Sequence, residues 1–109
     1  EEIEKEILKN QNFNGSWNEV NLMEIIIKNK NWNEIFTNFS NKFSDNIKKE
    51  NEKIIIFTLY VLNFINYEIK DAKILNKLKL IISKGEKYVR NNSNKIDLYS
   101  EEVKDIFKF

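Results

Sequence analysis

The chain has 109 residues, 41% of them hydrophobic and 13% aromatic, which is enough apolar material for one domain with its own core. Its net charge of +1 gives no bulk attraction to nucleic acid or acidic lipid. The sequence contains neither cysteine nor histidine, so disulfides, thiolate or imidazole metal sites and His-dependent nucleophilic catalysis are excluded.

The first 30 residues predict two helices joined by a turn. The first helix covers residues 1–11, with Ile3, Ile7 and Leu8 on one face. Asn and Gly tolerate left-handed backbone angles, so residues 12–15 predict a turn. Ser16 and Glu19 then match a capping box for a second helix at about residues 17–30. We expect its buried stripe to comprise Val20, Leu22, Met23, Ile26 and Ile27.

A third helix is expected to begin after Asn31, whose side chain can cap it, and to end within residues 40–46. Apolar and mostly aromatic residues recur along it at helical spacing: Trp32, Ile35, Phe36, Phe39 and Phe43. We predict that this face belongs to the core. The alternative is a groove for a partner helix.

Residues 47–68 predict a long central helix. Between residues 54 and 67 none is charged, and a helix this apolar nearly all round lies in the centre of a bundle. The uncharged stretch is shorter than the ~20 residues that a membrane span needs, so we expect no membrane insertion. The sequence therefore predicts an all-α fold, a single bundle of five to six helices around residues 47–68.

Asp71 is expected to cap the next helix, which follows so closely that it should pack antiparallel to the central one. Gly85 lies inside its apolar seam, and glycine there indicates close approach of a neighbouring backbone. Four basic residues share another face: Lys70, Lys73, Lys77 and Lys84. We interpret this face as a solvated surface, with nucleic-acid binding as the alternative.

After a polar linker, a last short helix is predicted at about residues 100–107. The C-terminal segment carries five large apolar side chains: Tyr99, Val103, Ile106, Phe107 and Phe109. It either docks onto the bundle or presents an amphipathic helix to a groove on a partner. For the second alternative, the candidate partner-binding residues are Tyr99, Val103, Ile106 and Phe107.

The most specific local pattern runs from Ile7-Leu8 through Gln11 to Phe13-Asn14-Gly15-Ser16-Trp17. Gly15, Ser16 and Trp17 are predicted to form a structural turn, with Trp17 as a packing anchor. A ligand-binding role of Trp17 is the alternative. The pattern resembles the L-x-x-Q-x-x-D/N-G-S-W signature that opens the C-terminal helical domain of proteins with VIT and von Willebrand factor A domains. We call residues 11–17 the signature turn.

The same type of domain ends the vault poly(ADP-ribose) polymerase and attaches it to the major vault protein. The resemblance thus implies a non-catalytic protein–protein interaction module. Its partner would be the major vault protein, and it would tether a larger parent protein to the vault, a ribonucleoprotein particle. Residues 1–109 would form a single domain, the C-terminal part of that parent. No cofactor, metal or small-molecule substrate is expected.

Two other functions remain open at this point. One is a structural C-terminal cap of a VIT/von Willebrand A protein without vault binding. The other is a nucleic-acid-binding helical domain. No signal peptide is visible and cysteine is absent, so we expect a cytoplasmic location.

Overall fold

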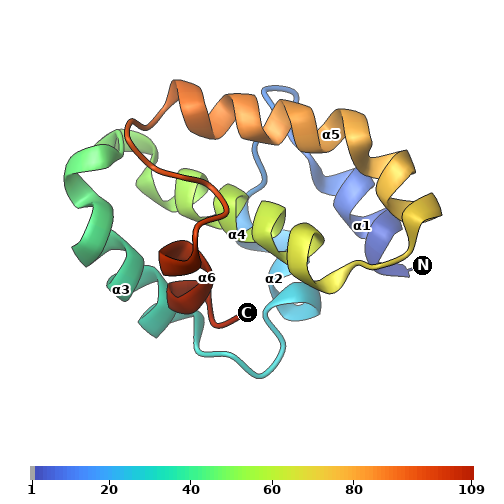
Figure 1. The fold of residues 1–109 in the computed structure, drawn as a ribbon, viewed down its shortest axis with the longest axis horizontal. Coiled ribbons are helices and arrows are strands. Elements are labelled where there is room, and N and C mark those ends of the chain that lie inside the picture. Colours follow the sequence, from blue (N-terminus) through green and yellow to red (C-terminus); the bar gives the residue numbers. More distant parts are fainter. Residues whose placement is uncertain (1) are drawn as a thin grey trace.

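The computed structural model describes residues 2–109, except for the side chains of Glu2, Val20 and Asn21. Glu1, where the first helix was predicted to begin, and the side chain of Val20, expected in a buried stripe, lie outside this description. The described residues form six α-helices and no β-strand, which confirms the all-α bundle (Figure 1): α1 (Glu2–Asn10), α2 (Glu19–Ile26), α3 (Trp32–Phe43), α4 (Glu52–Glu68), α5 (Ala72–Asn91) and α6 (Glu101–Phe107).

Helix α4 is the centre of the bundle, as its sequence predicts. Every side chain from residue 55 to residue 65 is buried. Helix α5 runs antiparallel to α4 along one side, α1 and α2 lie behind, and α3 and α6 cover the remaining side (Figure 1). A helix that is covered by neighbours on most sides has no broad solvent-exposed face on which polar residues would be favoured. Its two fully buried polar residues, Thr58 and Asn63, instead hold neighbouring segments by hydrogen bonds.

The predicted start of α4 at Ile47 is wrong, because the helix begins at Glu52. Ile47 is extended and forms an isolated antiparallel bridge with Ser93. The backbone N–H of Lys48 donates to the carbonyl of Asn92 at 3.1 Å, and that of Asn94 donates to the carbonyl of Asn46 at 2.9 Å. These backbone groups are satisfied by a distant segment, so they do not enter the helix.

The predicted capping box at Ser16 and Glu19 is also wrong. Helix α2 begins at Glu19 and not at residue 17, and the Ser16 hydroxyl donates to Oδ1 of Asn14 at 2.7 Å. The carboxylate of Glu19 accepts a hydrogen bond from the indole N–H of Trp32. Helix α2 ends at Ile26, shortly before Lys28 with its positive φ of 56°, so it is shorter than predicted.

The predicted caps Asn31 and Asp71 are confirmed, and Ser100 adds a cap that was not predicted, whereas Leu8, expected on the apolar face of α1, is exposed. Asn31, Asp71 and Ser100 each accept a backbone hydrogen bond at the start of α3, α5 and α6. The aromatic face of α3 belongs to the core: three of its five residues are buried and the other two partly buried. The Trp32 indole meets the rings of Phe57 and Tyr60 edge-on, both at centroid distances of 5.6 Å.

Candidate functional site

The signature turn is fastened to helix α5 by the side chain of Gln11. Its Nε2 donates to the carbonyl of Gly15 at 2.9 Å and to the carbonyl of Ile81 at 2.8 Å. Within the turn, the backbone N–H of Asn12 donates to the Ser16 carbonyl at 2.7 Å. One amide therefore closes the turn and ties it to a helix 70 residues further along the chain.

Gly15 permits this close contact. Its φ is +97°, a value that residues with a side chain rarely adopt, and an added Cβ would lie 2.4 Å from the carbonyl oxygen of Lys84. Gly85 faces it from α5, where an added Cβ would lie 2.9 Å from Cζ3 of Trp17. The carbonyl oxygen of Gly15 lies 3.5 Å from the same Cβ position, so the neighbouring backbone expected at Gly85 is present, while the closest atoms belong to side chains.

Trp17 anchors the turn in the core, and its side chain is fully buried. The indole N–H donates to the carbonyl of Ile7 in α1 at 2.9 Å. The backbone N–H donates to Oγ1 of Thr58 in α4 at 2.8 Å, and that hydroxyl donates back to the Trp17 carbonyl at 3.2 Å. Gly15, Ser16 and Trp17 are all buried, as a structural turn requires, and the Trp17 indole does not reach a surface where a ligand could bind.

The C-terminal segment docks onto the bundle. Val103 and Phe107 are fully buried, whereas Tyr99 and Ile106 are half-buried. The Phe107 ring stacks on that of Phe39 at 5.1 Å and meets Tyr60 edge-on at 5.2 Å. Of the two alternatives in the sequence, the structure adopts the docked one. A partner could reach Val103 and Phe107 only if α6 left the bundle.

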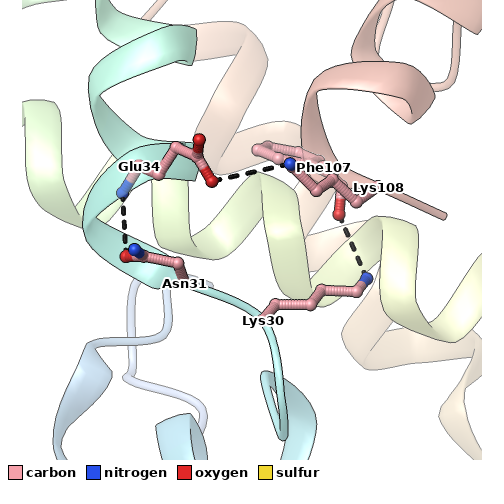
Figure 2. A network of polar contacts seen from close by, with 5 residues as sticks. All are labelled: Lys30, Asn31, Glu34, Phe107 and Lys108. Carbon is pink, nitrogen blue, oxygen red and sulfur yellow. Dashed lines mark hydrogen bonds and ion pairs between the residues drawn. The ribbon is translucent and has the colours of Figure 1, made fainter.

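Polar contacts hold the end of α6 against the connection between α2 and α3 and against the first turn of α3 (Figure 2). Lys30 Nζ donates to the carbonyl of Phe107 at 3.1 Å, and Lys108 pairs with Glu34 at 3.5 Å. The Lys30 ammonium also lies 3.6 Å from the centre of the Phe109 ring, a cation–π contact. Burial lowers the pKa of Lys30, and the nearby carboxylate of Glu68 partly offsets this effect.

Further hydrogen bonds hold the segment that precedes α6. Asn63 Nδ2 in α4 donates to the carbonyl of Leu98 at 3.0 Å. The Tyr99 hydroxyl donates to the Glu86 carboxylate in α5 at 2.7 Å. Burial and this hydrogen bond raise the pKa of Tyr99. The C-terminal segment is therefore attached to α4 and α5 as well as to α3.

One surface feature was missed in the sequence. Phe13, at the tip of the signature turn, is fully exposed and borders a cleft of about 470 Å³ whose other walls include Lys84, Lys87 and Tyr88. The only feature of the sequence that could have indicated an exposed Phe13 was its position in a turn between two buried segments. Lys73, Lys77 and Lys84 are exposed on α5, as predicted for a solvated face, whereas Lys70 is exposed but lies before the helix begins at Ala72.

Residues 2–109, as far as they are described, contain no cluster of three or more acidic side chains arranged to hold a metal ion. In the same part of the chain, no helix has both the length and the apolar character needed to cross a membrane. Comparisons of the chain with models of protein families, with curated proteins and with solved structures gave no match. These comparisons leave the resemblance to the VIT/von Willebrand A tail domains as an expectation from the sequence.

Proposed function

We propose that this chain is a non-catalytic protein-interaction module that binds the major vault protein and tethers its parent protein to the vault particle. The observation that carries the proposal is the structural role of the signature residues Gln11, Gly15 and Trp17. Gln11 ties the turn to α5, Gly15 fits against the Lys84 carbonyl, and Trp17 fills the centre of the bundle. A signature in which Gln11, Gly15 and Trp17 each build the fold supports a recurring type of domain.

The surface offers supporting features for a binding role. Phe13 is fully exposed, Leu80 is 70% exposed and Leu8 is 41% exposed. Single exposed apolar side chains are common on soluble proteins. Phe13, however, lies at the tip of the signature turn itself, where the fold gains nothing from a phenyl ring. A partner that covered this ring would remove apolar surface from water.

The proposal is tested by co-sedimentation of the purified chain with vault shells assembled from major vault protein alone. We expect the chain to pellet with the shells at micromolar concentration. Shells preloaded with the tail domain of vault poly(ADP-ribose) polymerase should take up less of it, because the two would compete for one site. The absence of co-sedimentation at about 50 µM, where even a weak specific complex is populated, would overturn vault binding.

The same preparation distinguishes the structural-cap function. In that case the chain would not bind shells but would bind VIT or von Willebrand A domains of its own parent protein. A nucleic-acid-binding domain would instead retain RNA or DNA with an affinity that falls steeply as salt is added. A flat titration at low salt would remove that function.

A further inference from the structure

A cleft of about 470 Å³ opens between the signature turn, the start of α4 and the last turns of α5. Its apolar side chains are Phe13 and Ile54, and its basic side chains are Lys84 and Lys87. Tyr88 and four asparagines complete the lining, and none of the lining residues is acidic. The cleft thus combines an apolar surface, two cations and several amides.

The cations of the cleft are not used by the fold. In the described part of the chain, neither Lys84 nor Lys87 forms an ion pair. Three residues apart on a helix, they project on the same side of α5. Two unpaired ammonium groups beside apolar side chains favour a ligand that brings carboxylates with it.

Tyr88 adds a free hydrogen-bond donor. The residue is only 7% exposed, and its hydroxyl has no hydrogen-bond partner among the described residues. Among the described residues, Asn63 Oδ1 is the only side-chain polar atom that is both fully buried and without a hydrogen-bond partner. The Tyr88 hydroxyl also has no partner, so it is not fully buried and must reach solvent. A tyrosine hydroxyl is protonated at neutral pH and can donate, and burial raises the pKa of Tyr88 further.

The backbone of the signature turn that carries Phe13 is fixed in place before any ligand binds. Gln11 holds the turn on Ile81 at 2.8 Å, and Gly15 lies against the Lys84 backbone. Phe13 therefore stands on a closed turn fastened to the helix that supplies both lysines. A ligand that binds here does not have to order the turn, and this lowers the entropic cost of binding.

We propose that this cleft binds an extended acidic segment of a partner protein that carries an apolar side chain among its carboxylates. The carboxylates pair with Lys84 and Lys87 and accept from the Tyr88 hydroxyl, while the apolar side chain covers Phe13 and Ile54. Asparagine amides around the rim can bond the backbone of the segment. The inference deepens the proposed function, since it names the surface and the partner's chemistry.

A nucleic acid fits the cleft less well. A phosphate backbone needs a continuous basic track. Only two lysines line the cleft itself, and the net charge of the chain is +1. A short peptide with a few carboxylates matches this local pair of charges, so we argue for the peptide and leave RNA as an outcome of the test.

The probe is a fluorescein-labelled nonapeptide of alternating Glu and Asp with Phe at its centre, titrated with the whole chain at low salt. The amide version of the peptide, with Gln and Asn in place of Glu and Asp, measures the contribution of charge. The protein variants are Lys84→Glu/Lys87→Glu, Phe13→Ala and Tyr88→Phe. Lys73→Glu/Lys79→Glu changes the net charge equally on exposed positions of the same helix and serves as the matched control.

We expect micromolar binding of the acidic peptide and little binding of the amide peptide. The Lys84/Lys87 variant should weaken binding about tenfold or more, and Phe13→Ala about fivefold. The control variant should lose at most about twofold through general electrostatics. Amide chemical shifts that move with the peptide should cluster at residues 13–14, 51–54 and 84–92.

Results of two kinds would overturn the inference. One is a failure of the acidic peptide to bind, or binding that the control pair weakens as much as the cleft pair does. The other is tighter binding of a uridine decanucleotide than of the peptide at these same residues, which would assign the cleft to RNA. Since no vault protein is present, this test and the vault co-sedimentation can fail independently.

Discussion

At the scale of single residues, two glycines allow the signature turn to lie against α5. An added Cβ on Gly15 would meet the Lys84 carbonyl oxygen, and one on Gly85 would meet Trp17 and Leu62. The two glycines also face each other, since the Gly15 carbonyl oxygen is 3.5 Å from the position of a Cβ on Gly85. The space that each side chain would need is already filled by the other segment.

Gly85→Ala should destabilise the chain, although alanine is the better helix former by about 1 kcal/mol. The new methyl would lie 2.9 Å from Trp17 Cζ3 and 3.1 Å from Leu62 Cδ2, and overpacking of this kind costs about 1–3 kcal/mol. After the propensity gain is subtracted, we expect a net loss of up to about 2 kcal/mol in urea unfolding. Ser83→Ala, at an exposed position of the same helix, should be neutral or stabilising. A gain for both variants would contradict the packing at Gly85.

Buried tyrosines predict that stability falls at alkaline pH. Burial raises the pKa of Tyr60, with a further contribution from Glu68, and burial and Glu86 raise the pKa of Tyr99, both above the ordinary value of 10.0. The folded chain thus keeps protons that the unfolded chain releases above pH 10. Their stabilisation is complete below pH 10 and is lost as pH rises further, by at most about 1.4 kcal/mol per pH unit for each tyrosine.

Lys30 acts in the opposite direction, because burial lowers its pKa below 10.5 and its contribution grows as pH rises to that value. Burial also raises the pKa of Tyr88. The three tyrosines outweigh the one lysine, so the free energy of unfolding should fall above about pH 10. Urea unfolding from about pH 8 to about pH 11.5 measures the slope, and Tyr60→Phe should reduce it. An equal slope in the variant would show that Tyr60 does not hold its proton more tightly in the folded state.

At the scale of elements, α6 is held partly by one residue outside it. Lys30 bonds the Phe107 carbonyl and lies over the Phe109 ring. Lys30→Met keeps an apolar side chain of similar length but removes the ammonium, at a cost of about 1 kcal/mol. We expect amide hydrogen exchange in α6 to become about fivefold faster. Lys9→Met, at an exposed position of α1, should leave this exchange unchanged, and equal protection in both variants would show that Lys30 does not hold α6.

Elements that depend on interactions between neighbouring residues could be predicted from the sequence, whereas those that depend on distant segments could not. Asn31, Asp71 and Ser100 cap helices through residues two or three positions away, and such caps can be read from adjacent letters. The start of α4 could not be read, because Ile47 pairs with Ser93 across the chain. Likewise, Glu19 bonds Trp32, so the capping pattern at Ser16 was misleading. The cleft was missed because its walls come from three separate segments.

At the scale of the whole molecule, one apolar cluster joins all six helices. It includes Ile7 of α1, Leu22 of α2, Trp32 of α3, Leu78 of α5 and Val103 of α6, all around α4. The Cα radius of gyration is 12.9 Å, close to the ~13 Å of a compact domain of this length. Since the C-terminal helix contributes to the same cluster as the signature turn, the two ends of the chain should unfold together.

The same substitution, Phe to Ala, at a buried and at an exposed position tests whether α6 belongs to the single core. Phe107 is fully buried against Phe39 and Tyr60, and Phe107→Ala should cost about 3–5 kcal/mol, a large part of the about 5–15 kcal/mol that a domain possesses. Phe13 is fully exposed, so Phe13→Ala should change the stability by less than about 0.5 kcal/mol. Thermal unfolding should show one transition, lowered by about 15 °C or more for Phe107→Ala. If Phe107→Ala left the main transition in place and only detached α6, the helix would be an accessory that a partner could displace.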